Sequence, residues 1–434
     1  MFFINTDQEK DRMLLSELHK LIGLIFIDDI VFSYKRHSKN KECSQIVISP
    51  KESFEDTKTG KLVEVISSDI LEKIELNFSM VKESNKPLDN LDRPIEEDNL
   101  LLNSTPDIDC EIKKIRVIIK KFLQDNSLKF EESIFPPNPI VCLTHDVDSL
   151  KGRSFFRAFG WLTRGLLHLN FLDSLRRSYH LFQDKADYQD SLEKISEIEL
   201  GYGFRSTLFF LSLPFFISHE GRRYRITKKK YKLTIKSLLS KGFEIGLHTS
   251  RMGFRRNSVL NKEKSRLTQL VGKENLSGVR NHYLSGNFPK IWEVYEKHNL
   301  KYDASLGWSN NLGYRAKTSN PFSPINLKEL KTFNLVEFPL IIMDSAIEDK
   351  GADYIFDQCS HFIKEAAKNK SVITLLWHTD RIYNPEYENY GLAYSKILQL
   401  LTDLNFKSKT CSEVLAMYRE NSQKLKLNQS NYEL

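Results

Sequence analysis

The feature that most constrains the fold of this chain is an apolar run that stops at two carboxylates one residue apart. The segment reads Val141-Cys142-Leu143-Thr144-His145-Asp146-Val147-Asp148. Such a run predicts a strand buried inside a sheet, which would bring both carboxylates to the end of that sheet. Carboxylates at a strand end can bind a metal ion or accept a proton. An Asp-x-Asp pair alone is more often part of a cap or a turn.

Later segments of the chain repeat this arrangement. Residues 243–248 and 371–378 are apolar runs that end at a histidine, and residues 278–283 place an arginine and a histidine after a short apolar stretch. In a barrel of parallel strands, the C-terminal strand ends meet at one face. A single histidine is usually an ordinary hydrogen-bonded residue, but several at the same place on consecutive strands indicate a site. One pocket is therefore expected to contain Asp146, Asp148, His248, Arg280, His282 and His378.

Composition limits the class of protein. With 434 residues and 40% hydrophobic content, the chain can form two or more domains with proper cores. No stretch approaches the roughly 20 apolar residues of a membrane span, and we see no signal peptide. The five cysteines are scattered and form no Cys-x-x-Cys pair, so neither a disulfide framework nor a thiolate zinc site is indicated. We therefore expect a cytoplasmic protein in a reducing compartment.

The charge balance argues against nucleic acid as a partner. The net charge is +7, with 64 basic and 57 acidic residues, which is mild for this length. Lysine-rich runs such as residues 228–230 are typical of solvated faces, and no nucleic-acid-binding motif is present. A basic surface that faces an anionic glycan or a membrane stays open as an alternative.

Residues 1–135 are predicted to form a smaller N-terminal α/β accessory domain. The proline cluster at residues 135–139 marks its end, because proline stops a helix and favours extended chain. Hydrophobic periodicity and polar composition predict helices at 14–24 and 111–123, strands at 46–49 and 62–66, and a loop or linker at 84–110.

Residues 136–434 are predicted to form the larger domain, in which strands and helices alternate. This alternation favours parallel strands with helices outside. Strands are expected at 140–144, 206–211, 243–248, 277–280, 302–305, 336–340 and 371–377. Helices are expected at 191–200, 232–239, 263–271, 291–298, 354–368 and 394–404.

An aromatic-rich insertion, residues 155–172, follows the carboxylate pair closely. Arg157 and Arg164 are a heptad apart in it. Three interpretations stay open: a helix packed over the barrel, a substrate lid, or an interfacial helix that makes peripheral contact with a membrane.

Several of these segments, taken in order, resemble motifs of the polysaccharide deacetylase superfamily of carbohydrate esterases. The matching segments are T-H-D-V-D at 144–148, E-I-G-L-H at 244–248, R-x-H-Y-L at 280–284, Y-D-x-S-L-G at 302–307 and Leu-Trp-His at 376–378. The resemblance covers roughly residues 138–420. It implies an α/β fold with a distorted (β/α) barrel. It also implies a hydrolase that removes acetyl groups from an N-acetylated or O-acetylated glycan or glycolipid, in bacterial surface polysaccharide metabolism such as exopolysaccharide biosynthesis.

The resemblance also implies catalytic roles for individual residues. Asp146 corresponds to the catalytic base, and Arg280 to the arginine that orients this base. His378 corresponds to the histidine of the family's L-x-H motif, which acts as the general acid. An arginine beside a carboxylate favours the ionised form, so this pairing suits a base.

Metal ligands and substrate contacts are implied in the same way. Asp148 and His248 correspond to ligands of a divalent metal, usually zinc. Trp308 resembles an aromatic residue that lines the substrate pocket, and Tyr283 is expected to contact the substrate as well. The metal would polarise the acetyl carbonyl and lower the pKa of a bound water.

One position departs from the family pattern. The family usually has a second histidine four residues after the first, and here Met252 stands at that place. A thioether is a poor ligand for a hard or borderline divalent ion with carboxylate partners. The metal therefore either loses a ligand or takes one from elsewhere. His282 is the candidate, because it would point the same way as Arg280 from an extended segment.

The leading hypothesis is thus a metal-dependent deacetylase. A hydrolase of the same superfamily that works without a metal is a second hypothesis. A non-catalytic glycan-binding or scaffold protein on a decayed barrel is a third. Met252 supports the third hypothesis, whereas the retained acidic, basic and histidine residues oppose it.

Overall fold

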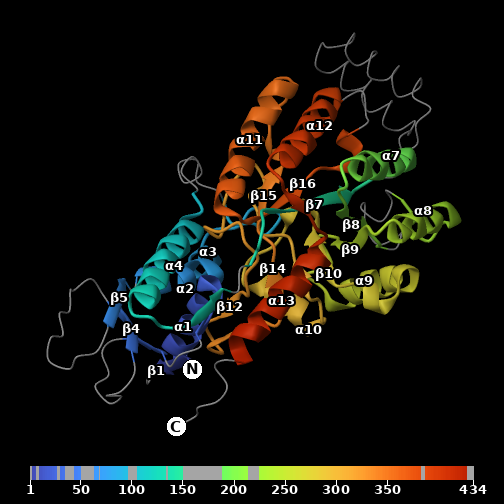
Figure 1. Ribbon diagram of the computed structural model, residues 1–434. Helices are drawn as coiled ribbons and strands as arrows, with labels where there is room; N and C mark the ends of the chain where they lie inside the picture. The colour runs from blue at the N-terminus through green and yellow to red at the C-terminus, as the bar shows by residue number, and fades with distance from the viewer. Residues whose placement is uncertain are drawn as a thin grey trace.

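The computed structural model (Figure 1) describes residues 2–5, 9–26, 30–34, 44–49, 63–67, 69–95, 105–132, 135–149, 188–213, 224–382 and 387–427. The aromatic-rich insertion at 155–172 lies outside the described residues, so its three interpretations stay predictions. Among the helices that the structure describes, none is both long and apolar enough to cross a membrane.

The larger part of the described chain is a curled sheet of parallel strands. Its strands are β7 (Ile140–Val147), β8 (Ser206–Leu211), β9 (Glu244–Thr249), β10 (Gly278–Asn281), β11 (Tyr302–Asp303), β14 (Val336–Glu337), β15 (Leu340–Met343), β16 (Val372–Leu376) and β17 (Lys407–Ser408). Neighbouring strands follow the order β14-β11-β10-β9-β8-β7-β16-β15, and β17 pairs with β7. All of these pairs are parallel. The predicted parallel α/β architecture is confirmed.

The two ends of this sheet are consecutive in the chain, which makes the sheet a distorted barrel. Only Phe338 and Pro339 separate β14 from β15, although these strands lie at opposite ends of the strand order. The sheet must therefore bend back on itself. The prediction of one strand over 336–340 was wrong at this point. Proline has no N–H to donate to a strand partner, and the chain passes here from pairing with β11 to pairing with β16.

Helices cover the outer face of the barrel. They are α7 (Tyr188–Gly201), α8 (Lys229–Ser240), α9 (Asn257–Val271), α10 (Lys290–Lys297), α11 (Ala352–Asn369), α12 (Glu388–Asp403) and α13 (Cys411–Leu427). Helix α11 shows why such segments pack here: Ile355, Cys359, Phe362, Ile363 and Ala366 recur at helical spacing and are all buried.

The residues of β7 alternate between two apolar clusters, and this alternation positions the site. Val141 and Leu143 pack with residues of α11 and α12 on the outside. Ile140 and Cys142 pack in a different cluster, with residues of β8, β11 and α13. Because side chains alternate along a strand, Thr144 and Asp146 continue the face of Ile140 and Cys142. The sequence pattern therefore carries Asp146 onto the barrel's inner face at the C-terminal end of β7.

The N-terminal region contains a second, smaller parallel sheet. Its strand order is β1-β3-β4-β5, and a two-stranded antiparallel ribbon joins β2 to β6. The strands are β1 (Phe2–Asn5), β2 (Leu24–Phe26), β3 (Ile30–Tyr34), β4 (Ser44–Ser49), β5 (Val63–Ser67) and β6 (Phe130–Glu132). The helices are α1 (Glu9–Ile22), α2 (Asp69–Phe78), α3 (Val81–Ser84) and α4 (Asp107–Asp125).

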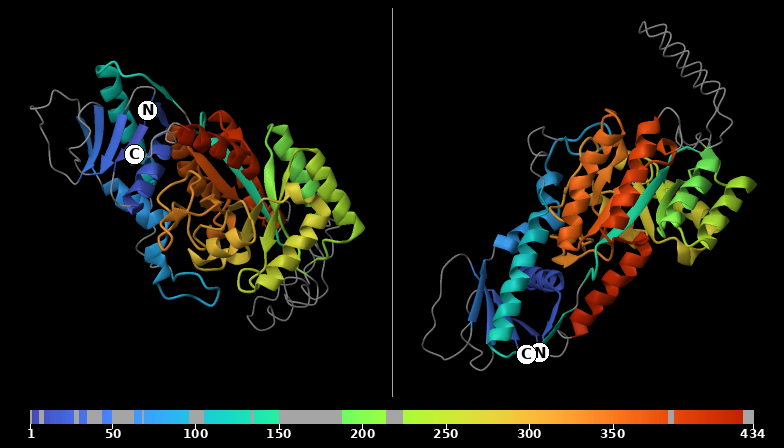
Figure 2. Two further views of the ribbon diagram at one scale, coloured as in Figure 1. Left: turned by 90° about the horizontal axis from the view of Figure 1, so that it is seen from below. Right: turned by 45° about the horizontal axis from the view of Figure 1, so that its top comes forward.

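The N-terminal region packs closely on the barrel, as two further views show (Figure 2). Phe78 at the end of α2 stacks on Phe322 with 4.1 Å between ring centroids. Arg315 of the barrel donates to the Glu83 carboxylate at 2.5 Å, and both side chains are largely buried. Part of the stretch 84–110, predicted as a loop or linker, forms a turn at residues 87–95 that lies against the barrel. The domain boundary at 135 stays a prediction.

Candidate active site

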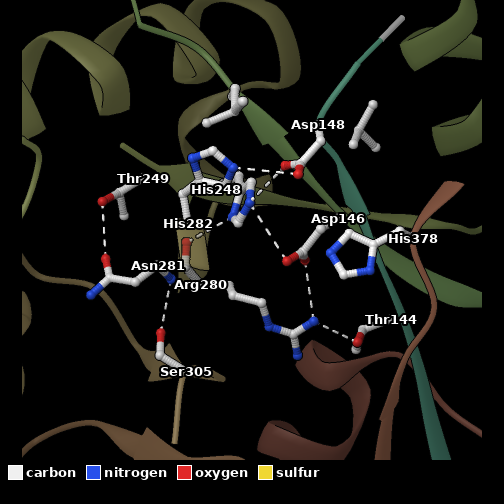
Figure 3. A network of polar contacts seen from close by, with 12 residues as sticks. Thr144, Asp146, Asp148, His248, Thr249, Arg280, Asn281, His282, Ser305 and His378 are labelled. Carbon is white, nitrogen blue, oxygen red and sulfur yellow. Dashed lines mark hydrogen bonds and ion pairs between the residues drawn. The ribbon is translucent and has the colours of Figure 1, made fainter. Parts of the chain in front are cut away.

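The carboxylates of Asp146 and Asp148 lie at the C-terminal end of β7, next to residues from β9 and β10 (Figure 3). Asp146 is the penultimate residue of β7 and is buried, and Asp148 follows directly after the strand. The register pairs Arg280 with His248, so β9 and β10 present these two residues side by side. The structure thus brings together all six residues that the strand-end pattern singled out.

A buried arginine holds Asp146. Arg280 Nη1 donates to Asp146 Oδ1 at 3.2 Å and to Thr144 Oγ1 at 2.7 Å, and Arg280 Nε donates to the Ala304 carbonyl at 2.8 Å. The guanidinium also lies 4.6 Å from the ring centroid of Phe209. The positive charge of Arg280 therefore compensates the negative charge of the Asp146 carboxylate inside the barrel. A buried charge without such a partner would be costly.

Two histidines converge on the other carboxylate. His248 Nε2 lies 3.2 Å from Asp148 Oδ1, and His282 Nε2 lies 3.3 Å from Asp148 Oδ2. One ligand atom from each of these three residues falls within 4.8 Å of the others. Burial alone would raise the pKa of Asp148, but the charges and hydrogen bonds of His282 and His248 lower it well below its usual value. The cluster therefore offers one carboxylate and two imidazoles to a cation.

The orientation of the His248 ring fits this use. Its Nδ1 lies 3.0 Å from the Arg280 carbonyl, which can only accept, so Nδ1 carries a proton and Nε2 is the nitrogen whose lone pair a cation can use in the neutral ring. His248 Nε2 is buried, with Asp148 Oδ1 at 3.2 Å and Asp146 Oδ2 at 3.5 Å. A buried lone pair surrounded by carboxylate oxygens is suited to a divalent cation. The donor set of one Asp and two His suits zinc or a similar ion.

His378 lies at the end of the β16 segment and is paired with Asp344. His378 Nδ1 donates to Asp344 Oδ1 at 2.6 Å, and the His378 backbone N–H donates to Asp344 Oδ2 at 2.9 Å. Burial alone would lower the pKa of His378, but the charge and hydrogen bond of Asp344 raise it to about 10. The imidazole is therefore protonated at neutral pH, with its other nitrogen left to act on a ligand.

One cavity connects these groups. Its volume is about 350 Å³, within the range of small-molecule sites. Its walls are formed by Arg93, Asp146, Asp148, His282, Tyr283, Leu284, Ser309, Met343, Ser345, Leu376, His378, Asp380, Arg381 and Tyr387. The base candidate, part of the metal cluster and the acid candidate thus face the same space, as a reaction that moves two protons requires.

The aromatic residues expected at the substrate site have different surroundings. Tyr283 lines the cavity, is 43% exposed, and stacks on His282 with 3.7 Å between ring centroids. Trp308 lies beside Arg315, whose guanidinium carbon is 5.1 Å from the Trp308 ring centroid. Trp308 is absent from the residues that line the cavity, whereas its neighbour Ser309 is present. The substrate roles of Tyr283 and Trp308 stay predictions.

Met252 lies in a turn between β9 and α9. A ligand four residues after His248 would need to be in this turn, because α9 begins only at Asn257. The third donor of the described cluster comes instead from His282, directly after β10. The ligand role of His282 stays a prediction, but its position is the one that the prediction requires.

Asp344 is a residue of the site that the sequence patterns did not predict, although a signal is present. Leu340-Ile341-Ile342-Met343 is an apolar run that ends at an aspartate, the pattern already used for β7. The strand predicted over 336–340 stops at the first residue of this run, so the end of the run and its aspartate were left unassigned. Arg93 of the N-terminal region was also missed, because no local pattern connects it to the barrel.

A second layer of buried polar residues holds β10 and β11 in place. Asn281 accepts from Thr249 Oγ1 at 3.0 Å and donates through its side chain to the Ser285 carbonyl at 2.6 Å. Ser305 Oγ accepts from the Asn281 backbone N–H at 2.9 Å and donates to Asp303 at 2.5 Å. These contacts fix the strand end that carries Arg280 and the segment that carries His282.

Two buried acids, Asp303 and Glu337, lie next to each other beneath this layer. Burial raises the pKa of Asp303 to about 6, and burial together with the charge of Asp303 raises the pKa of Glu337 well above its usual value. Glu337 accepts from Trp292 Nε1 at 2.8 Å and from the Leu306 backbone N–H at 3.0 Å. Asp303 and Glu337 are partners in the register of β11 and β14, so the pair connects these two strands.

No protein-family model matches this sequence, and no curated protein gives a significant match. Solved structures do resemble the chain. A protein described as a polysaccharide deacetylase from Mycobacterium smegmatis is 14% identical over 69% of this chain and 95% of its own, with a TM-score of 0.45. A peptidoglycan deacetylase from Bacillus subtilis is 16% identical over 69% of this chain and 100% of its own, with a TM-score of 0.34.

A CE4 family pseudoenzyme from Bacillus anthracis is also similar. It is 12% identical over 64% of this chain and 66% of its own, with a TM-score of 0.34. The structural neighbours of this chain therefore include polysaccharide deacetylases, the family that its sequence motifs resemble, and a pseudoenzyme of the same kind.

Proposed function

We propose that this chain is a metal-dependent hydrolase that removes acetyl groups from an acetylated glycan or glycolipid. The observation that carries the proposal is the presence of three chemical elements at one cavity: the Asp148–His248–His282 cluster, the Asp146–Arg280 pair and the His378–Asp344 pair. Deacetylation needs a Lewis acid or its equivalent, a base and an acid. The motif resemblance to polysaccharide deacetylases supports the same chemistry.

Asp148, His248 and His282 would hold a divalent cation, with zinc as the expected ion. When bound, the cation would polarise the acetyl carbonyl and make a water more acidic. Asp146 Oδ2, which lies 3.5 Å from His248 Nε2, would take the proton of that water. Asp146 Oδ1 stays bound to Arg280 and keeps the carboxylate oriented.

His378 would supply the second proton. Its Nδ1 is engaged by Asp344, so Nε2 is the nitrogen that can protonate the leaving group. The carboxylate of Asp344 also stabilises the imidazolium form before the reaction. Base and acid come from different strands and face one cavity, so neither needs to move far to exchange protons with a bound substrate.

The test is acetate release by the purified full chain, loaded with zinc, from a panel of N-acetylated and O-acetylated oligosaccharides. Release by the wild type and its loss in Asp148→Ala are expected. Zinc-independent release would support the metal-free hydrolase instead. Absence of release from every member of the panel, in protein that retains stoichiometric zinc, would contradict the proposed function and favour a glycan-binding protein.

A further inference from the structure

The N-terminal region forms part of the cavity wall through the turn at residues 87–95. The Ile95 N–H donates to the Pro87 carbonyl at 2.9 Å, and the Asp89 N–H donates to the Arg93 carbonyl at 2.8 Å. Asp89 Oδ1 accepts from the backbone N–H groups of Leu91 at 2.8 Å and Arg93 at 2.9 Å. An aspartate that caps its own turn in this way makes the turn rigid.

Several contacts attach this turn to the barrel. The Gly286 N–H donates to the Leu91 carbonyl at 3.0 Å, and Arg251 Nη2 donates to the Asn90 carbonyl at 2.8 Å. Arg255 forms an ion pair with Asp92. Because Gly286 follows the segment that carries His282, the turn lies next to the metal cluster.

Arg93 is the residue of this turn that lines the cavity. Its Nε and Nη2 donate to Asp89 Oδ2 at 2.8 and 2.7 Å, and its Nη1 lies 3.4 Å from the Tyr283 carbonyl. These contacts hold the guanidinium in place before any ligand binds. Less conformational entropy is therefore lost when it binds a ligand. A guanidinium carries five N–H groups, so donors remain for a ligand.

Arg381 lines the same cavity from the segment after β16. Its guanidinium carbon lies 5.0 Å from the ring centroid of Tyr387 and 4.6 Å from that of Tyr390. Its Nε is 3.8 Å from Asp344 Oδ2, beyond the distance of a strong hydrogen bond. Its Nη1 lies 3.5 Å from the Asp344 carbonyl. These contacts orient the guanidinium, and its remaining N–H groups can donate to a ligand.

We propose that Arg93 and Arg381 bind an anionic group of the substrate, so that the acetylated sugar carries a carboxylate or a phosphate. This inference rests on the proposed function and names its substrate class. Guanidinium groups that are fixed in place are well suited to carboxylate and phosphate oxygens. Asp146 and Asp148 belong to the base and the metal cluster, and Asp380 is the other acidic residue among those that line the cavity.

Binding, rather than turnover, tests the inference. Calorimetry on the zinc-loaded full chain compares N-acetylglucosamine, N-acetylmuramic acid and N-acetylglucosamine 1-phosphate, which are neutral, carboxylated and phosphorylated versions of one acetylated sugar. The wild type is expected to bind at least one anionic sugar about a hundredfold more tightly than the neutral one, about tenfold for a charged hydrogen bond from each arginine. Whichever of the two anionic sugars binds more tightly indicates whether the anionic group of the substrate is a carboxylate or a phosphate.

A bound metal ion also attracts anions, so variants are needed to distinguish its contribution to anion binding from that of the arginines. Arg93→Gln and Arg381→Gln should each reduce the anionic preference about tenfold while zinc content and affinity for N-acetylglucosamine stay the same. Arg93→Lys should recover part of the preference, since it restores charge without the fork geometry. Arg255→Gln is the matched control, because it weakens the turn's attachment but lies outside the cavity lining, and it should keep the preference.

Equal binding of the three sugars by the wild type, binding of none of them, or full anionic preference in both glutamine variants would overturn the inference. Failure of the proposed function gives a different result. An anion-selective chain that releases no acetate contradicts deacetylation but supports the role of the arginines. Acetate release without anion selectivity supports deacetylation but contradicts the role of the arginines.

Discussion

His378 Nδ1 lies 2.6 Å from Asp344 Oδ1, and the same carboxylate accepts the backbone N–H of His378 at 2.9 Å. One buried aspartate therefore fixes both the ring and the main chain of the acid candidate. Burial would raise the pKa of Asp344, but His378 and Arg381 lower it, so the carboxylate stays charged. The pair joins β15 to β16, which are neighbours in the sheet but are separated by α11 in the chain.

The first prediction concerns the alkaline limb of the pH–rate profile. A general acid must be protonated, so activity should fall as pH rises through the pKa of His378, which is raised to about 10 in the metal-free protein. A bound cation would move this limb to lower pH by repulsion. Asp344→Asn removes the charge that raises the pKa and should shift the limb further toward neutral pH. A profile of kcat against pH measures the shift.

His378→Ala should lower kcat by about 10²–10⁴-fold with zinc retained, and should abolish the alkaline limb. Wild-type turnover in this variant, or an unchanged limb in Asp344→Asn, would show that another group donates the proton.

The second prediction concerns the base. Asp146→Asn should lower kcat by about 10²–10⁴-fold and remove the acidic limb of the profile, because an amide cannot take a proton at any working pH. Zinc content should stay near one equivalent, since Asp148 and both histidines remain. Loss of zinc together with activity would instead identify Asp146 as a ligand.

The third prediction concerns the metal. Asp148→Ala and His248→Ala should each abolish stoichiometric zinc, and His282→Ala should weaken zinc affinity strongly, as measured by metal analysis and competition with a chelator. Met252→Ala is the matched control and should leave affinity unchanged, because a thioether is a poor ligand for such an ion. Full zinc affinity in His282→Ala would contradict its proposed role.

The fourth prediction concerns the buried acid pair of Asp303 and Glu337. Both pKa values are raised in the folded protein, so the folded state binds more protons than the unfolded state at intermediate pH. The free energy of unfolding should therefore decrease as pH rises from about 4, where the unfolded carboxyls ionise, through 6 and above.

Glu337→Gln should flatten this dependence, because the amide mimics the protonated acid. Glu337→Ala should cost roughly 2–4 kcal/mol by leaving the donors of Trp292 and Leu306 unpaired in the core. Denaturant unfolding at several pH values checks both variants. A slope in Glu337→Gln equal to that of the wild type would show that another group binds the proton.

Most of the barrel could be predicted from the sequence, because local patterns specify it. Apolar runs such as Val141–Leu143 and Ile373–Leu375 predict strands, and amphipathic segments such as α11 predict helices. Period-two alternation along β7 and the parallel arrangement together predict that Asp146 lies at the strand's C-terminal end with His248 and Arg280 nearby. The division at Pro339 was missed, because an apolar stretch does not show where a strand changes its partner.

The sequence by itself determined which residues end the strands, since side-chain alternation and hydrophobic periodicity depend only on near neighbours in the chain. The tertiary structure alone decided which of these residues meet. It paired His378 with Asp344 across two strands, placed His282 beside Asp148, and carried Arg93 into the cavity from the N-terminal turn. Each of these contacts joins residues far apart in the chain, so it depends on barrel closure and on packing between the two regions, which no local pattern encodes.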